Sequence, residues 1–168
     1  MKKTPDIFGQ ALLDYSNGTY IEDIIVHSSI AHDDIMPIPY LFRGFEEMPL
    51  IEQKALEMSM GKVLDVGCCA ASHSIHLQEK GFDVTGIDIS KGAIALSRKR
   101  NLRKAYHKHI LHHIGKYGTI LLLMNGTGIF ESLSKIDTYL QHLKSLLKQG
   151  GQILLDGSDI KYMFEDND

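Results

Sequence analysis

The sequence has few cysteines and no tryptophan. Its two cysteines, Cys68 and Cys69, are adjacent in a chain of 168 residues. Neighbouring cysteines rarely form a disulfide with each other, and this pair lacks the C-x-x-C spacing of a zinc site. Such usage is typical of a reduced protein, so we expect a cytoplasmic location.

The sequence also lacks a long apolar run and an excess of positive charge. The longest purely apolar run, Ile120 to Met124, is far shorter than the roughly 20 residues of a membrane span. No apolar stretch follows the lysines of the initial MKKTPD, as it would in a signal peptide. The net charge of −3 gives no general attraction for phosphate backbones or anionic lipids. We therefore expect neither a membrane nor a nucleic-acid partner, and we interpret the basic run from Arg98 to Lys104 as a solvated helix end.

From about Lys62 onward, short apolar runs alternate with helix-like segments. Because the runs are apolar at consecutive positions, the strands should be buried on both faces, as in a parallel sheet covered by helices. The sequence therefore predicts a doubly wound, mainly parallel α/β core of five strands over residues 61–168. The predicted strands are Val63 to Val66, Asp83 to Asp88, a weaker Lys104 to Ile110, Thr119 to Met124 and Gln152 to Asp156.

Three segments between these strands predict helices. Two of them are Ser72 to Lys80 and Ser90 to Arg100. The third has apolar residues at steps of three and four, which form one stripe on a helix: Leu133, Ile136, Leu140, Leu143 and Leu147. Gly150 and Gly151 should then stop this helix.

Residues 1–60 have a different pattern, which we interpret as a lid or substrate-binding extension of the same domain. Asp6 to Tyr15 predicts a short amphipathic helix, and Pro49 predicts the start of a helix that runs to Met58. Tyr20 to Pro39 should be irregular, because its prolines prevent a continuous helix.

The segment KVLDVGCCAASHSIHLQEKG predicts a ligand site at one edge of the sheet. A buried strand ends at Gly67, turns tightly and enters a helix near Ser72. In open α/β sheets this first turn lies at the carboxyl edge, where ligands bind. Asp88 follows at the end of the second strand, where a carboxylate can accept the ribose hydroxyls of a nucleoside cofactor. Asp88 could instead cap the following helix, but Ser90 can take that role.

Four segments resemble the class I S-adenosylmethionine-dependent methyltransferases. They are VLDVGCCAAS, GIDIS, TILLLMNG and LKQGGQILLD, which occur in the order and spacing of that family. The dinucleotide fingerprint G-x-G-x-x-G is absent after the first strand. The resemblance covers about Lys62 to Asp156. It implies a Rossmann-like fold that binds S-adenosylmethionine and transfers its methyl group.

The resemblance also implies roles for the residues at matching positions. Asp65 and Gly67, with Cys68 in the same loop, would shape the pocket for the methionine half of the cofactor. Asp88 would hold the ribose, and Ile89 would pack against the adenine. The carboxyl edge of the sheet would thus bind the whole cofactor.

The sequence departs from the family pattern at three further positions in the cofactor-binding segments. Cys69 and Ala71 stand where the family usually has glycine, and His109 lies near the place of an acid that binds the adenine amino group. A β-carbon in a left-handed backbone costs about 1–2 kcal/mol. Cys69 could therefore strain the loop and crowd the cofactor, or its side chain could point into the core. His109 belongs to a histidine cluster that lacks a nearby cysteine or acid, so we expect no metal site.

Asn125, just past the fourth strand, has two interpretations. The resemblance implies a place close to the transferred methyl group, whereas the following Gly126 is typical of a turn. The acceptor should be a small molecule. If the acceptor must lose a proton, the base should come from the N-terminal segment. Arg43, in the same segment, could pair with the methionine carboxylate of the cofactor. The candidate bases are His27, His32, Asp33, Asp34 and Tyr40.

Two other functions stay open at this point. A degenerate methyltransferase-like protein that binds without catalysis is favoured by Cys69, by His109 and by the short C-terminal end. A nicotinamide-dependent reductase on a similar sheet is disfavoured by the missing third glycine and by Asp65 inside the first strand.

The sheet of the family normally continues beyond the fifth strand, whereas this chain stops twelve residues after Asp156. We therefore expect the later strands to be missing and the fifth strand to form an open edge, on which a homo-oligomer could form. Three explanations fit this observation: the chain is a fragment of a longer protein, it is a naturally short relative, or its edge strand is covered by a partner.

Overall fold

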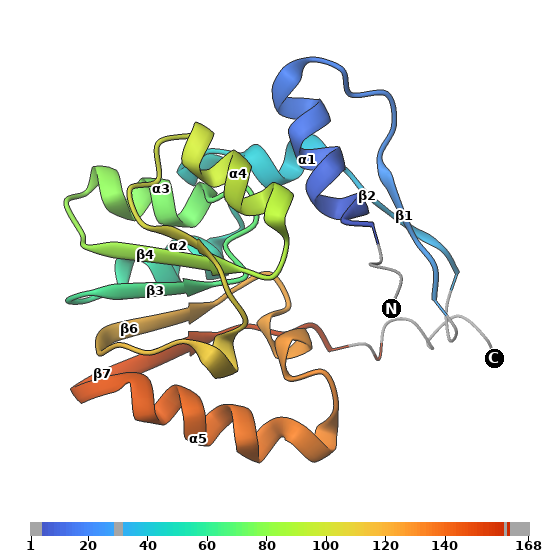
Figure 1. The fold of residues 1–168 in the computed structure, drawn as a ribbon. Coiled ribbons are helices and arrows are strands. Elements are labelled where there is room, and N and C mark those ends of the chain that lie inside the picture. Colours follow the sequence, from blue (N-terminus) through green and yellow to red (C-terminus); the bar gives the residue numbers. More distant parts are fainter. Residues whose placement is uncertain (1–4, 29–31, 160, 162–168) are drawn as a thin grey trace.

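The computed structural model describes residues 5–28, 32–159 and 161. Its centre is one five-stranded sheet with the order β5-β4-β3-β6-β7, in which every neighbouring pair is parallel (Figure 1). The predicted parallel sheet of five strands is thereby confirmed. Its strands are β3 (Val63–Val66), β4 (Val84–Asp88), β5 (Ala105–His107), β6 (Tyr117–Leu122) and β7 (Leu147–Leu155).

Helices cover both faces of this sheet, as a doubly wound fold requires. On one face, α5 (Ile136–Leu146) packs against Leu64, Ile120 and their neighbours. On the other face, α2 (Leu50–Glu57) and α3 (Ser72–Glu79) pack against Val63 and Leu121. The helix α4 (Lys91–Lys99) lies beside α3 on that second face, over β4 and β5. All the strand residues of β3 and β4 are buried, in agreement with their continuous apolar runs.

The predicted stripe of α5 is wrong in part. Leu133 is 88% exposed and precedes the α-helix in a 3-10 turn, η5 (Leu133–Lys135), while Leu140 is 39% exposed. The buried face is instead formed by Tyr139, Leu143 and Leu146, with Ile136 packed beside them. An aromatic residue, absent from the predicted stripe, therefore defines the face that meets the sheet.

The predicted glycine stop of this helix is also wrong. The helix ends at Leu146, and Gly150 and Gly151 lie within β7. Gly150 has a left-handed φ of +74°, and the pairing of β6 with β7 shifts register between Tyr117 and Thr119. A β-carbon on Gly151 would lie 3.0 Å from the carbonyl oxygen of Tyr117. The glycines thus permit a strand irregularity with close backbone approach.

The N-terminal segment contains more regular structure than its prolines suggest. It begins with α1 (Ile7–Asn17), as predicted, although Ile7 is exposed. An antiparallel hairpin of β1 (Ile24–Val26) and β2 (Asp34–Met36) occupies part of the region that we expected to be irregular. Two 3-10 turns, η1 (Ile38–Phe42) and η2 (Phe45–Glu47), then lead into α2, whose cap is Pro49.

This N-terminal segment shares a core with the sheet domain. Leu12 of α1 and Ile38 and Leu41 of η1 pack with Ala93 and Leu96 of α4. In Figure 1, α1 lies alongside α4 above the carboxyl edge of the sheet. Its action as a lid, and the boundary at residue 60, stay predictions. No helix formed by the described residues is long and apolar enough to cross a membrane.

Candidate functional site

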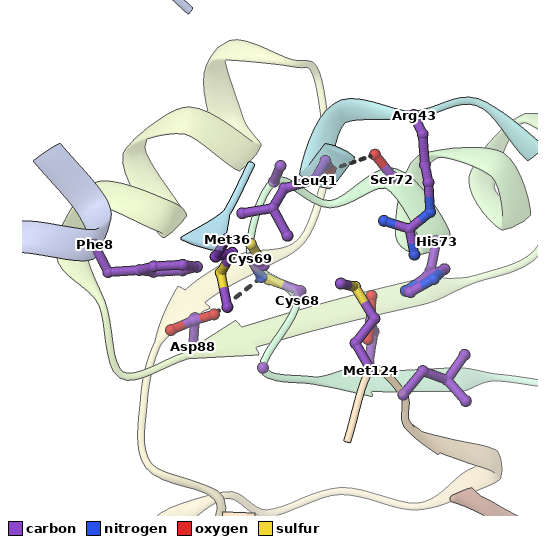
Figure 2. A pocket seen from close by; sticks show the side chains of 14 residues that line it. Phe8, Met36, Leu41, Arg43, Cys68, Cys69, Ser72, His73, Asp88 and Met124 are labelled. Carbon is purple, nitrogen blue, oxygen red and sulfur yellow. Dashed lines mark hydrogen bonds between the residues drawn. The ribbon is translucent and has the colours of Figure 1, made fainter. Parts of the chain in front are cut away.

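Two cavities open at the carboxyl ends of β3, β4 and β6. The first, of about 190 Å³, lies between the loop after β3 and the N-terminal segment; Phe8, Leu41 and Met124 are among its lining residues (Figure 2). The second, of about 300 Å³, lies between the ends of β4 and β6. Gly67 and Asp88 line both cavities. A ligand at Gly67 and Asp88 could therefore extend into both spaces.

The loop after β3 has the left-handed backbone that the family pattern implies. The φ angles are +75° at Gly67, +51° at Cys69 and +65° at Ala71. The loop is closed by the N–H of Ala71, which donates to the carbonyl of Cys68 (2.6 Å), and by the N–H of Gly67, which donates to the carbonyl of Ile87 (2.9 Å). Cys69 and Ala71 thus each carry a β-carbon where glycine is favoured, at a cost of about 1–2 kcal/mol each.

The side chains of the two cysteines lie in different surroundings. Cys68 is 5% exposed and its Sγ is 3.8 Å from the Oγ of Ser97, so this side chain packs in the core. Cys69 is half-buried and lines the first cavity, while it also contacts the apolar cluster of α1 and η1. Burial raises the pKa of Cys68 and raises that of Cys69 to about 12. Both are therefore neutral thiols at pH 7, unsuited to nucleophilic chemistry.

Ala71 lines neither cavity. It is fully buried at the start of α3 and packs with Ile94, Leu102 and Ala105. Ala71 thus has a packing role in the core, and its predicted contact with the cofactor stays a prediction.

Asp88 lies at the end of β4 and is 8% exposed. Its Oδ2 accepts a hydrogen bond from the backbone N–H of Cys69 (2.9 Å), and its Oδ1 accepts one from the N–H of Ser90 (2.8 Å). Ser90 caps α4, since its Oγ accepts from the N–H of Ala93 (2.9 Å). Each Asp88 oxygen keeps a further lone pair for a ligand. Burial raises the pKa of this carboxyl.

Asp65, inside β3, is the more deeply buried acid of the first cavity. Its Oδ2 accepts from the Oγ of Ser74 on α3 (2.6 Å), and burial raises its pKa. Asp65 thus lines the cavity wall while it ties β3 to α3.

A buried ion cluster, which the sequence analysis did not find, forms one side of the first cavity. The Nη2 of Arg43 donates to both carboxylate oxygens of Glu52 (2.6 and 2.5 Å), and the Nη1 donates to the carbonyl of Tyr40 (2.6 Å). The Nε2 of His73 lies 2.6 Å from the Oε2 of Glu52. Burial acts to raise the pKa of Glu52, but the hydrogen bonds of His73 and Arg43 hold it below its usual value.

Arg43 and His73 line the first cavity at the side opposite to Asp88, as Figure 2 shows. Glu52 has no recognisable spacing to either residue, since it comes from the first turn of α2 in the N-terminal segment. The site therefore has a carboxylate end at Asp88 and a cationic end at Arg43.

The second cavity contains Ile89, His109 and Asn125, as well as an unpredicted acid, Glu131. The Nε2 of His109 lies 3.4 Å from the Oε1 of Glu131. Hydrogen bonds from Lys135 and Tyr139 lower the pKa of Glu131 to about 2. A carboxylate is thus present next to His109, but it comes from the loop before α5, where no motif marks it.

Asn125 lines the second cavity rather than the first, and it is also a turn residue with a φ of +62°. Its Oδ1 accepts from the Oγ of Ser158 (2.6 Å). The neighbouring N–H groups of Met124 and Gly126 donate to the carboxylate of Asp156 (2.9 and 3.2 Å). The turn interpretation of Asn125 thus has geometric support. A place close to the transferred methyl group stays a prediction, because the residue lies on the side of Ile89 and His109.

The candidate bases of the N-terminal segment do not line the first cavity. His27 and Asp33 form an exposed pair at 2.8 Å near the hairpin, and His32 and Asp34 are also exposed. The ring of Tyr40 lies under the guanidinium of Arg43, 3.8 Å from ring centroid to Cζ. No group of three or more metal-ligating side chains occurs among the described residues.

Known proteins are similar to this chain in sequence and in fold. Residues 40–162 match the sequence profile of a family described as a methyltransferase domain. A SAM-dependent methyltransferase from Bacteroides fragilis, solved in complex with S-adenosyl-L-homocysteine, is 36% identical with a TM-score of 0.90; the match covers 96% of this chain and 68% of that one. This chain belongs to the SAM-dependent methyltransferases.

Other matches are more distant or shorter. Streptomyces venezuelae DesVI is 17% identical with a TM-score of 0.59 over 72% of this chain and 55% of that one, which shows the shared fold alone. The curated relative YqeM of Bacillus subtilis is 42% identical over 40 residues. That segment is 24% of this methyltransferase-family chain and 16% of YqeM, so the chain spans a small part of this relative.

Proposed function

We propose that this chain binds S-adenosylmethionine and transfers its methyl group to a small-molecule acceptor. The observation that carries the proposal is the position of Asp88, a buried carboxylate between two cavities with hydrogen-bonding capacity left on both oxygens. An elongated nucleoside cofactor needs such an acceptor near its middle and a separate space at each end.

The second cavity fits the adenine. Ile89 supplies an exposed apolar side chain, and the carboxylate of Glu131 beside His109 can accept from an exocyclic amino group. Gly67 lines both cavities, so a ligand that passes from one to the other would meet no side chain at this position. These residues support adenine at one end and ribose at Asp88.

The first cavity fits the charged methionine end. Its cationic side holds Arg43, which keeps one Nη1 hydrogen beyond those bonded to Tyr40 and Glu52 and can donate it to a carboxylate. Asp65 is the acid in the same cavity, and it can accept from an ammonium group. Opposite charges at one end suit an amino-acid moiety.

When bound, S-adenosylmethionine would supply an electrophilic methyl group. The chain contributes orientation and an apolar wall that excludes water. Phe8, Met36, Leu41 and Met124 are among the apolar residues around the first cavity. Among the described lining residues, His73 is the imidazole best placed to accept a proton. Its Nε2 hydrogen points to Glu52, which leaves the lone pair on Nδ1.

A binding protein without catalysis is the second candidate. It is favoured by the left-handed Cys69, whose side chain lines the cofactor cavity where the family has no side chain. Cofactor binding with no transfer to any acceptor would support this function.

The proposal is tested by calorimetric titration with S-adenosylhomocysteine of the wild type, Asp88→Ala and Asp83→Ala. Asp83 is the matched control, since it is an exposed aspartate at the opposite end of β4, paired with Lys104. We expect wild type and Asp83→Ala to bind alike and Asp88→Ala to bind at least about tenfold more weakly, the equivalent of a lost charged hydrogen bond. A folded wild type that does not bind would refute the proposal.

A further inference from the structure

The N-terminal ends of α1 and α4 meet in direct backbone contact. A β-carbon on Gly92 would lie 2.5 Å from the Cα of Gly9, and one on Gly9 would lie 2.7 Å from the Cα of Gly92. Glycine at both crossing positions is therefore required for this approach. The two positive helix ends consequently converge on one point.

A single carboxylate, that of Asp6, occupies this point. Its Oδ1 accepts from the N–H of Gly9 (3.0 Å) and so caps α1. Its Oδ2 accepts from the N–H of Gly92 (2.9 Å) and from the Oγ of Ser90 (2.9 Å), at the start of α4. Burial acts to raise the pKa of Asp6, but these hydrogen bonds lower it, so the group is ionised at pH 7. One charged side chain thus caps two helices.

Both ends of this bridge reach the candidate cofactor site. On the α4 side, Ser90 donates its backbone N–H to Asp88. On the α1 side, Phe8 follows Asp6 by two residues and lines the first cavity, on the same side as Asp88 (Figure 2). Asp6 lines neither cofactor cavity itself, so its connection to the site runs through Phe8 and Ser90.

The side of α1 that faces away from α4 is less closely packed. A surface hollow of about 670 Å³ lies between α1 and residues 19–25; Asp6 borders it at one end, and Ile7 and Gln10 on its border are exposed. Most contacts of the helix with other elements are thus with α4 and η1. Loss of the Asp6 bridge would free the end that carries Phe8.

We propose that Asp6 is a positioning residue for cofactor binding, a latch that holds α1 and its Phe8 over the first cavity and holds Ser90 against Asp88. This inference rests on the proposed function. The latch sets cofactor affinity and the frequency with which α1 opens, while the reacting atoms are contacted by other residues.

The test compares Asp6→Asn with Asp14→Asn. Asparagine caps helices about as well as aspartate, so Asp6→Asn retains an α1 cap but removes the charge and sets an amide N–H against the donors of α4. Asp14 lies on the same helix, accepts a hydrogen bond from Gln10 (2.8 Å) and borders the hollow between α1 and residues 19–25. Calorimetry with S-adenosylhomocysteine and amide hydrogen exchange of α1 are measured for each protein.

We expect Asp6→Asn to weaken binding about tenfold and to speed exchange in α1 while β3 stays protected, and Asp14→Asn to change neither. Because coupling between sites is reciprocal, saturating S-adenosylhomocysteine should slow exchange of α1 in the wild type. A purely structural role for Asp6 predicts no such effect of the ligand.

Unchanged affinity together with unchanged α1 exchange in Asp6→Asn would overturn the inference. So would a loss of protection throughout the sheet, which would indicate general unfolding. A wild type that does not bind would end the proposed function and the cofactor role of Asp6, whereas faster exchange confined to α1 would still support the bridge between the helices.

Discussion

At the scale of single residues, the loop after β3 combines a strained backbone with neutral side chains. Cys69 and Ala71 both have left-handed φ angles, and the N–H of Cys69 nonetheless donates to Asp88. The loop therefore keeps the hydrogen bond that orients the carboxylate, although its residue types oppose the conformation. The strain is held by the surrounding packing, as is typical of functional loops.

Cys69→Gly should relieve part of this strain. We expect a gain in the free energy of unfolding of about 1 kcal/mol, because the left-handed penalty of about 1–2 kcal/mol is partly offset by the flexibility of glycine in the unfolded chain. Urea denaturation measures the gain. In the matched control, Cys68→Gly, the loss of a buried side chain should destabilise the fold. Equal effects at both cysteines would contradict this account of the loop.

Asp65→Asn should stabilise the fold and weaken cofactor binding. Burial raises the pKa of Asp65 above its unfolded value, so the ionised carboxylate costs stability at neutral pH. The stability of the wild type should therefore rise as the pH falls through the folded pKa, and the advantage of asparagine should disappear there. Urea midpoints from neutral pH down to about pH 4 follow this change. An advantage independent of pH would show that charge is not the cause.

At the scale of elements, the position of α1 depends on one crossing point. Gly92→Ala would place a β-carbon 2.5 Å from the backbone of Gly9 and should force α1 away from α4. We expect a loss of about 1–3 kcal/mol in unfolding free energy, the usual cost of overpacking, with faster exchange in α1. Gly128→Ala is the control, since an added β-carbon there meets nothing within 4 Å. Similar losses in both variants would argue against a specific contact between the helices.

At the scale of the whole molecule, β7 forms an open edge of the described sheet. Its hydrogen-bonded neighbour in the described part of the chain is β6, on one side. A hollow of about 260 Å³ lies beside it, between β7 and the region of α2. Its lining includes the charged Lys54 and Asp156 but is mainly apolar, and Ile51, Met58 and Leu155 in it are more than two-fifths exposed. An exposed edge and an apolar patch together favour association.

We expect the purified chain to self-associate in a concentration-dependent way through this edge. Leu155→Lys should weaken the association, because it places a charge on the edge strand. Leu133→Lys, at an exposed leucine before α5, should leave it unchanged. Sedimentation velocity at rising concentration separates these outcomes, and a monomeric wild type would refute the prediction.

The sequence by itself determined the sheet and the place of the site. Continuous apolar runs marked β3, β4 and β6, and a small-residue turn after β3 with an acid after β4 marked the edge where Asp65 and Asp88 lie. These features are local, since periodicity and turn chemistry act over a few residues. The stripe of α5 was misplaced, because leucine spacing alone could not show that Tyr139 would face the sheet.

Only the tertiary structure decided which side chains complete the site. Asp6 accepts a hydrogen bond from Ser90, which is 84 residues away in the sequence, and His73 contacts Glu52, which is 21 residues away. Glu131, in the loop before α5, contacts His109. None of these partners has a characteristic spacing, because strand order and helix packing bring them together. The physical reason is that a charged group selects its partner by distance in space, and that distance is fixed only once the sheet and its helices have assembled.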